Sequence, residues 1–191
     1  SIDTFYQESG RAGRDGMYAV SVVNYGFKEV YELTQMIMES NLSELKKRHE
    51  IKKLRAMLGY CDTLQCRRQT LLNYLGEDIA VCGNCDICVS KKEQLYDATI
   101  IAQKVLSTIY RVQQKFSISH IIDVLRGKAS SSIQIWEHHK LSTFGIACEI
   151  SEKQLRRTVR QLYSQEIIDI DFNANMALKL TAKAVSIIRG I

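Results

Sequence analysis

The sequence contains no proline, and no apolar stretch in it approaches the ~18 residues that cross a bilayer. Without proline, breaks between elements must be marked by glycine and serine, so we expect helices to dominate the fold. The N-terminus has neither a signal peptide nor an initiator methionine. We therefore expect a soluble globular protein in which Ser1 is a cut made inside a longer chain.

Two motifs of nucleotide triphosphatases are also missing. The sequence has no phosphate-binding loop of the form GxxxxGK[ST] and no acidic magnesium-binding motif. Such enzymes need these parts to hold the phosphates and the metal ion. The chain by itself is therefore not expected to hydrolyse ATP.

The charge of the chain is moderately positive. Its 191 residues, enough for one or two domains, include 26 Lys and Arg against 21 Asp and Glu, a net charge of +5. That excess alone is weak evidence for a polyanionic partner. Basic side chains gather between Glu44 and Arg55 and again between Lys153 and Arg160. Taken singly, each cluster is explained nearly as well by a solvated helix face.

Residues 6–16, with the sequence YQESGRAGRDG, place two arginines between glycines. Glycine lets the backbone approach a ligand closely, and guanidinium groups bind phosphate oxygens bidentately. In a nucleotide triphosphatase, such an arginine can stabilise the charge on the transferred phosphoryl group. The simpler alternative is a glycine-rich turn with solvated arginines. The candidate residues are Gln7, Gly10, Arg11, Gly13 and Arg14.

Four of the six cysteines form a metal-ligand pattern, namely Cys66, Cys82, Cys85 and Cys88. Gaps of two residues let consecutive thiolates turn onto one ion, and the distant fourth cysteine completes a tetrahedron. We favour one Zn²⁺, because four-cysteine zinc sites are common and nothing else in the sequence suggests redox work. The ion should be structural, because four thiolates leave no position for water or substrate. An iron–sulfur cluster is the serious alternative, and a disulfide framework is a weaker one. Cys61 and Cys148 lie outside the pattern, and we expect them to be small buried hydrophobic residues.

The first half of the chain is expected to be helical after one strand. Residues 19–25 are rich in β-branched side chains and predict one strand of a larger sheet, whose other strands would precede Ser1. A helix and turn over residues 4–13 would lead into it. Apolar spacing then predicts helices over residues 27–38, 43–59 and 66–75, the last closed by Gly76.

The second half has the pattern of a winged helix. Ile101, Val105 and Ile109 line one face of a first helix, and Ser117 is expected to begin a second. Residues 127–132 are expected to be a polar loop. A capping box at Ser151 begins a third helix. Strands over residues 167–171 and 177–180 would flank the turn 173–175, followed by a last helix from residue 181.

The third helix of this half carries candidate DNA contacts. Lys153, Arg157 and Arg160 recur on the face opposite its apolar side chains, as a recognition helix along a duplex requires. Ser142 and Thr143, just before this helix, offer hydroxyls to the same phosphates. The alternative is a winged helix used only for protein contacts.

These motifs together resemble the RecQ helicase family. The string from Gln7 to Gly16 is similar to the last helicase motif of that family, and the block from Tyr60 to Cys88 resembles its zinc-binding subdomain. Residues 102–112, 122–127 and 141–145 are similar to the winged-helix region that follows in bacterial members. The resemblance covers essentially the whole chain and is strongest up to Cys88.

The resemblance implies a mainly α fold with small β elements. Residues 1–27 would be the last strand and helix of the second RecA-like motor lobe, residues 28–92 a helical zinc-binding subdomain, and residues 93–191 a winged helix. The full protein would be a 3′-to-5′ ATP-dependent DNA helicase of DNA repair, recombination and replication, with ATP and Mg²⁺ as its cofactors.

The resemblance also implies roles and partners. Arg14 would be the arginine finger, with Arg11 beside it, Gln7 positioning the nucleotide, and Gly10 and Gly13 allowing close approach. Expected partners are duplex DNA, junctions of single- and double-stranded DNA, and the single-stranded DNA-binding protein. No membrane is expected, and the expected location is the bacterial cytoplasm, at the nucleoid.

Two other readings of the sequence remain. One is a stand-alone zinc-containing DNA-binding regulator, and the other is a protein-docking module without motor activity. Within the RecQ reading, the expected wing turn is short and flanked by Phe172 and Met176. This departs from family members that use an aromatic wing tip, and it argues against strand separation by the wing.

Overall fold

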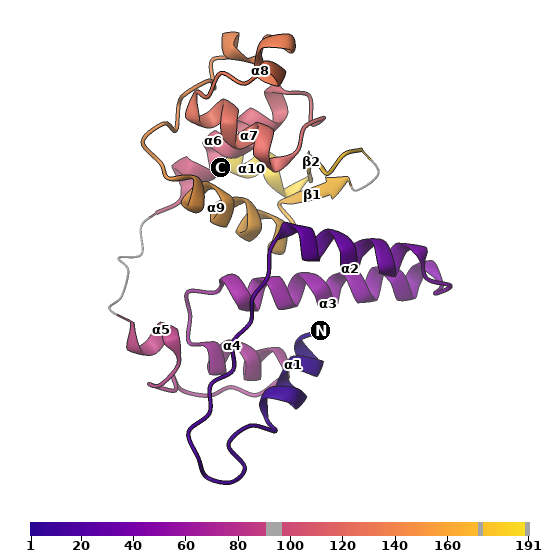
Figure 1. Cartoon of the computed structure of the whole chain (residues 1–191), viewed down its shortest axis with the longest axis vertical. Helices are drawn as coiled ribbons and strands as arrows, with labels where there is room; N and C mark the ends of the chain where they lie inside the picture. Colours follow the sequence, from indigo (N-terminus) through magenta and orange to yellow (C-terminus); the bar gives the residue numbers. More distant parts are fainter. Residues whose placement is uncertain (91–96, 172–173, 190–191) are drawn as a thin grey trace. The chain divides into compact units, whose positions relative to one another are not determined.

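The computed structural model describes residues 1–90, 97–171 and 174–189 (Figure 1). The chain divides into two compact units, Ser1–Leu95 and Tyr96–Ile191. Both are mainly helical, and the described strands are confined to one two-stranded sheet in the second unit. This confirms the expected fold class of mainly helical structure with small β elements.

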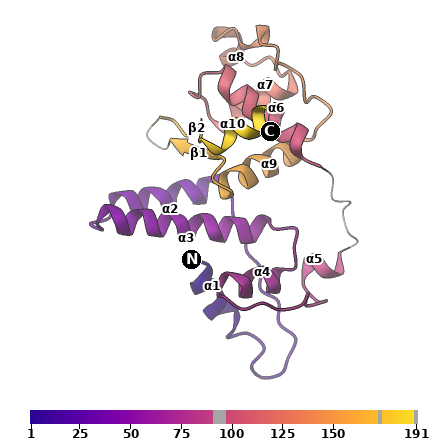
Figure 2. The ribbon, with the colours of Figure 1, turned by 180° about the vertical axis from the view of Figure 1, so that it is seen from behind.

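The described part of the first unit, residues 1–90, contains the helices α1 (Ile2–Ser9), α2 (Phe27–Glu39), α3 (Glu44–Asp62), α4 (Arg67–Tyr74) and α5 (Asp86–Val89). Helices α2 and α3 pack side by side as a hairpin in both views (Figure 1, Figure 2). Helix α1 packs on α3, where the core cluster Ile2, Tyr60 and Leu71 is buried. The Phe5 and Tyr60 rings lie 5.2 Å apart in this cluster. The predicted helices are therefore present, and their core is small.

The strand predicted over residues 19–25 is wrong. The segment has no regular secondary structure, and Tyr18 and Val22 are 93% and 83% exposed. A strand needs a neighbour to accept and donate its backbone hydrogen bonds. The described strands lie in the other unit and pair with each other, so this β-branched segment has no such neighbour. Of the strand and helix expected at this end of the chain, the structure has only the helix, α1.

The second unit is a winged helix. Its helices are α6 (Thr99–Arg111), α7 (Ile118–Arg126), the short α8 (Ser131–Ile135) with the 3₁₀ turn η1 (His138–Lys140), α9 (Glu152–Ser164) and α10 (Lys183–Arg189). Strands β1 (Ile168–Asp171) and β2 (Ala177–Leu180) pair antiparallel, with Ile168 opposite Leu180. Helices α6, α7 and α9 pack against one another, and α10 covers α6 (Figure 2).

Apolar side chains of all three main helices fill the core of this unit. Val105, Leu106, Ile109, Ile121, Ile122, Leu125, Leu155 and Val159 are at most 1% exposed. Ser151 forms the predicted capping box with Gln154 at the start of α9. The predicted loop over residues 127–132 is shorter than expected, because the Ser130 side chain caps α8 by accepting from the Ile133 N–H.

A close backbone approach fixes the segment before α9. Gly127 ends α7 with φ +70°, and a Cβ atom at this position would lie 3.2 Å from the Gly145 Cα. The Gly145 N–H donates to the Val124 carbonyl, and the Ala147 N–H donates to the Leu125 carbonyl. These two backbone hydrogen bonds join this segment to the end of α7.

Candidate metal centre and nucleic-acid interface

The four cysteines of the predicted pattern come together in the first unit. Cys66 is the residue before α4, Cys85 the residue before α5, Cys88 lies within α5, and Cys82 is in the loop between the two helices. Their sulfur atoms all lie within 4.8 Å of one another, and those of Cys82 and Cys88 are 4.0 Å apart. Tetrahedral Zn–S bonds of ~2.3 Å require sulfur separations of ~3.8 Å. The cluster therefore fits one Zn²⁺.

Backbone N–H groups donate hydrogen bonds to the sulfur atoms and so favour their thiolate forms, which bind a cation. The Cys82 N–H donates to Cys66 Sγ at 3.2 Å, and the Arg67 N–H donates to Cys85 Sγ at 3.4 Å. Burial alone would raise the pKa of the Cys66, Cys82 and Cys85 thiols, but hydrogen bonds from backbone N–H groups and neighbouring thiols outweigh it and lower each pKa. Hydrogen bonding with Cys85 raises the pKa of Cys88 to about 12. A bound metal ion favours the thiolate form of all four.

Arg67 and Asp86 brace the loop around the cluster. Two nitrogens of the Arg67 guanidinium donate to the two Asp86 carboxylate oxygens at 2.6 and 2.8 Å. A third nitrogen donates to the carbonyls of Tyr60 and Cys61 at the end of α3. The Arg67 guanidinium holds the pKa of Asp86 below its usual range. Sequence reasoning missed this pair, although each of the two directly follows a ligand cysteine.

The two remaining cysteines differ from the expectation of burial. Cys148 is exposed, with its thiol 3.7 Å from a Glu149 carboxylate oxygen, and Cys61 is only partly buried. Cys148 follows the loop that lies on α7 and points outward from it, which its apolar neighbours in the sequence did not reveal. All six cysteines are free, so the disulfide alternative does not hold in this structure.

The predicted motif of residues 6–16 begins in the last turns of α1 and continues as an exposed turn over residues 10–16, the arginine turn. Gly10 ends the helix, and Gly13 and Gly16 have φ +71° and +78°, where a side chain would strain the backbone. Arg14 donates from Nε to the Gly10 carbonyl at 3.2 Å, and Arg11 lies 3.7 Å from Glu8. Gln7, Arg11 and Arg14 are all exposed. The turn thus presents two guanidinium groups on one short segment.

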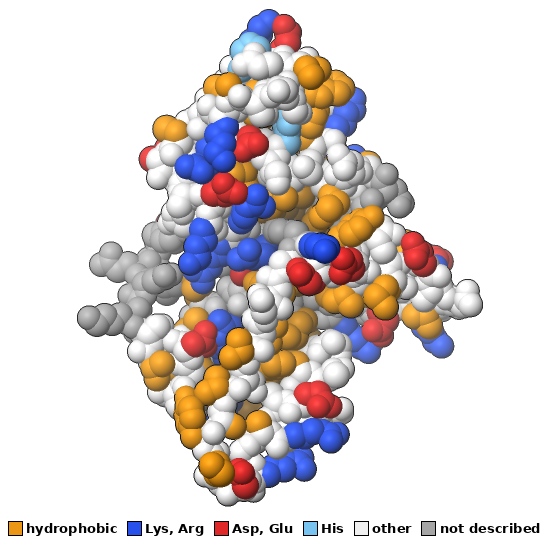
Figure 3. Space-filling model, viewed as in Figure 1, with side chains coloured by type: hydrophobic (Ala, Val, Ile, Leu, Met, Phe, Trp, Pro, Cys, Tyr) orange, Lys and Arg blue, Asp and Glu red, His pale blue; other side chains and the backbone are white. Residues whose placement is uncertain are grey.

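The predicted DNA contacts gather at α9. Lys153 is exposed, and Arg157 and Arg160 are half-buried. Glu152 at the start of this helix binds Arg156, with Lys128 at 3.3 Å and Arg126 at 3.6 Å. Lys and Arg side chains cluster on the face of this unit where α9 lies (Figure 3). Arg126 and Lys128, from the end of α7, enlarge the basic surface that the sequence pattern predicted from α9 alone.

Ser142 and Thr143, the two hydroxyl residues before α9, are placed differently. Ser142 is exposed. Thr143 is 4% exposed, and its Oγ1 atom has no hydrogen-bond partner among the described residues. Because its hydroxyl lies inside the fold, Thr143 is the less well placed of the two for a phosphate contact.

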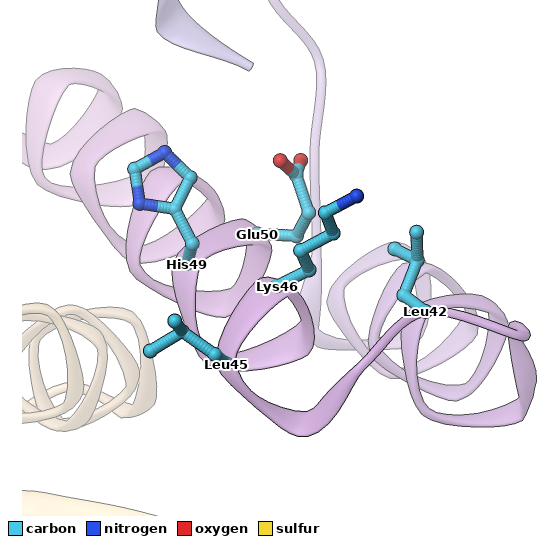
Figure 4. A pocket seen from close by; sticks show the side chains of 5 residues that line it. All are labelled: Leu42, Leu45, Lys46, His49 and Glu50. Atoms are coloured by element: carbon cyan, nitrogen blue, oxygen red, sulfur yellow. The ribbon is translucent and has the colours of Figure 1, made fainter.

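The basic run on α3 is partly neutralised by its own helix. Lys47 lies 3.3 Å from Glu44, and Lys53 lies 3.1 Å from Glu50. A hollow of about 540 Å³ at the start of α3 is lined by Leu42, Leu45, Lys46, His49 and Glu50 (Figure 4). Lys46 and Glu50 bring one positive and one negative side chain to the lining of this hollow, so it has no single sign of charge. The Lys47 side chain is 15% exposed and that of Lys53 30%, so the run is only partly a solvated helix face.

The expected wing turn lies only partly within the described residues. Phe172 and Asn173, which include the aromatic residue beside the expected turn, lie outside them. Asn175 and Met176 have φ +52° and +57°, the tight left-handed geometry of a short hairpin turn.

No described helix combines the length and apolar character needed to span a bilayer.

Comparisons with known proteins cover both units. The chain matches the RQC domain family over residues 92–191 and the RecQ zinc-binding family over residues 27–89. The second match favours zinc over an iron–sulfur cluster as the cofactor of the cysteine cluster, so we assign one structural zinc to it.

Full-length relatives give the same result. The chain is 40% identical over 192 residues to the ATP-dependent DNA helicase RecQ of Pasteurella multocida, covering 100% of this chain and 30% of that protein. It is 38% identical over 195 residues to that of Haemophilus influenzae, covering 100% and 31%. The Bacillus subtilis RecQ is 30% identical over 190 residues, covering 99% and 32%. The chain spans about a third of the length of these relatives, and it belongs to the RecQ family.

Proposed function

We propose that this chain is the C-terminal part of a RecQ-type ATP-dependent DNA helicase that unwinds DNA with 3′-to-5′ polarity in repair, recombination and replication. The observation that carries the proposal is the order of parts along one chain: an exposed arginine turn, a four-cysteine cluster and a winged helix. Three relatives matched over essentially the whole chain are named ATP-dependent DNA helicases. The proposal divides the chain into the end of the second motor lobe (residues 1–27), a zinc-binding subdomain (residues 28–92) and a winged helix (residues 93–191).

The arginine turn is the proposed contribution to ATP hydrolysis. Arg14 would approach the triphosphate as the arginine finger, Arg11 would add a second cation, and Gln7 would position the nucleotide. Gly10 and Gly13 would let the backbone come close to the phosphates. Because the phosphate-binding loop and the acidic motif are absent from the sequence, ATP and Mg²⁺ would be held by other parts of the full protein.

The cysteine cluster has a structural role in this proposal. Cys66, Cys82, Cys85 and Cys88 would each give one thiolate, which fills the tetrahedron and leaves no site for substrate. Through these four thiolates, α4, α5 and the loop between them would be crosslinked when zinc is bound. The chain's own part is to place two cysteines at helix starts and to brace them with Arg67.

Helix α9 is the proposed DNA-binding element. Lys153, Arg157 and Arg160 would contact phosphates of duplex DNA and of junctions, with Ser142 and Thr143 at the edge of the contact. A motor that works on many sequences needs phosphate contacts more than base contacts. We further propose the single-stranded DNA-binding protein as a partner and the nucleoid of the cytoplasm as the location.

Salt-dependent DNA binding tests the proposal on the 191-residue zinc-loaded chain. Anisotropy of a labelled forked duplex should show an affinity that falls steeply with salt, because neutralised phosphates release counterions. Arg157→Ala and Arg160→Ala should each weaken binding and lower the salt slope by about 1. Lys183→Ala removes the same charge from α10 and should have little effect. An affinity that does not change with salt would contradict the proposal and support a protein-docking role.

ATP hydrolysis gives a second test. The 191-residue chain should show no DNA-stimulated ATPase activity. In the full-length protein that contains it, Arg14→Ala should lower that activity by ~10³-fold, the usual contribution of an arginine finger. Lys28→Ala, another exposed cation of the same unit, is the matched control. Activity of the isolated chain would show that the triphosphate site has been misplaced.

A further inference from the structure

An aromatic pocket lies in the winged helix, away from the residues assigned above. It has a volume of about 600 Å³ and is lined by Lys115, Phe116, Ser117, His120, Asp123, Ser130, Ser132, Trp136 and Asn175. These residues come from the start of α7, from α8 with its flanks, and from the β1–β2 turn. The volume lies in the range of ordinary ligand sites, ~300–1,000 Å³.

A connected set of rings and hydrogen bonds builds one wall of this pocket. His120 stacks on Phe116 with ring centres 4.2 Å apart, and Trp136 meets Phe116 edge-on at 5.4 Å. His120 Nε2 lies 2.7 Å from Nδ1 of the buried His138, and its Nδ1 lies 3.2 Å from the Ser132 hydroxyl. Each ring is thus held by at least one neighbour, so the wall is preformed.

Burial lowers the pKa of both histidines of this wall, which favours their neutral forms. Burial, and then the proximity of His138, lowers the pKa of His120, with Asp123 opposing in part. Burial also lowers the pKa of His138. One nitrogen of the 2.7 Å pair donates and the other accepts, as neutral imidazoles do. The wall is therefore a polar and aromatic surface without a fixed cluster of cations, which does not suit a free phosphate or carboxylate ligand.

Trp136 is the residue that the fold does not explain. It is the single tryptophan of the chain, and 57% of it is exposed, although its ring packs edge-on against Phe116. An exposed indole beside ordered rings is a feature of binding surfaces. The hydroxyls of Ser117, Ser130 and Ser132 and the Asp123 carboxylate add hydrogen-bonding groups around it.

We propose that this pocket binds an unpaired nucleobase of single-stranded DNA, stacked on Trp136 beside Phe116 and His120. The inference rests on the proposed DNA binding of the winged helix, since the pocket reaches the β1–β2 turn of that fold through Asn175. A base has a π-face for the rings and edge groups for the hydroxyls and the carboxylate. Lys115 at the pocket lining gives a cation for the adjoining phosphate. Stacking tolerates every base, as a motor requires.

The single tryptophan provides a direct probe of this proposal. In the 191-residue zinc-loaded chain, fluorescence of Trp136 should be quenched when oligothymidylate is added and change little with blunt duplex. By anisotropy, Trp136→Ala should weaken binding of labelled oligothymidylate by about tenfold, within the usual range of base–aromatic stacking. Trp136→Phe keeps a π-face and should retain most of the affinity. Ile135→Ala, at the 77% exposed neighbour on α8, is the control.

The outcomes separate this inference from the proposed function. Normal duplex binding with no quenching by single strands would overturn the pocket assignment and leave the helicase proposal standing. An equal loss of duplex and single-strand affinity in Trp136→Ala, or the same loss in Ile135→Ala, would also overturn it. Failure of the chain to bind any DNA would refute the proposed function, and the pocket assignment with it.

Discussion

Each of the two units of this chain is stabilised in a different way. Among the bulkiest fully buried side chains of the described residues, Ile2 alone belongs to the first unit, and the others fill the second. The first unit instead gathers four cysteines into one cluster and braces them with charged side chains. A small core is commonly supplemented by a metal ion. We therefore expect the first unit to need zinc to fold, and the second unit to fold on the core of its own.

Removal of zinc should have the largest effect. Chelation of the ion should unfold the region around α4 and α5, since structural zinc sites contribute ~10 kcal/mol or more to folding. Hydrogen exchange should then show fast exchange for amides of α4 and slow exchange for those of α6, α7 and α9. Cys82→Ser should reproduce this result, and Cys148→Ser, at the exposed cysteine, should not. Loss of protection in both units together would contradict the comparison.

A cavity in the second core should have the next largest effect. Ile109 is 0% exposed, so Ile109→Ala should destabilise the winged helix by ~2–5 kcal/mol in urea unfolding. The zinc content should stay at one ion per chain. Tyr110→Ala, at the 67% exposed neighbour on α6, serves as the control and should change little. Loss of zinc from Ile109→Ala would show that the two units do not fold independently.

Removal of the brace should weaken the metal site without abolishing it. Arg67→Ala deletes the bonds to Asp86 and to the end of α3, so we expect zinc affinity to fall ~10–100-fold, as for other groups that orient metal ligands. Competition with a chelating dye measures this affinity. Arg68→Ala removes the exposed neighbouring charge and should leave it unchanged. Equal effects of the two substitutions would point to general electrostatics in place of the brace.

The smallest effect concerns pH and should be confined to the second unit. The pKa of His120 is lowered in the folded state, so the unfolded chain binds more protons below the ordinary histidine pKa of ~6.5. The contribution of His120 to the free energy of unfolding should be fully present above that pH. It should be lost as the pH falls through the lower pKa of His120 in the folded state. Urea unfolding of the second unit across this range should show the loss, and His120→Gln should reduce it. His49→Gln, in the first unit, is the control and should leave this loss of stability unchanged. A pKa of His120 above ~6.5 in an NMR titration would contradict the prediction.

Sequence patterns predicted a structural feature correctly where that feature depends on residues close together in the chain. The Ser151 capping box, the β1–β2 hairpin and the grouping of Cys82, Cys85 and Cys88 each depend on residues close in the chain, and all appear as predicted. Cys66 lies farther away in the chain, and its place in the cluster followed from the ligand pattern. The strand over residues 19–25 failed because β-branched side chains favour a strand only where a neighbouring strand exists. The pair His120 and His138 was missed because only the packing of α7 against the segment after α8 brings the two rings together.

Cys66 occupies the position just before the first turn of α4. The start of a helix is the step that costs most in helix formation, because several backbone dihedrals are fixed before hydrogen bonds compensate. A ligand held there by a metal ion fixes that first turn in advance. We therefore expect metal binding and nucleation of α4 to be coupled, so the folding rate of the first unit should rise with the free zinc concentration.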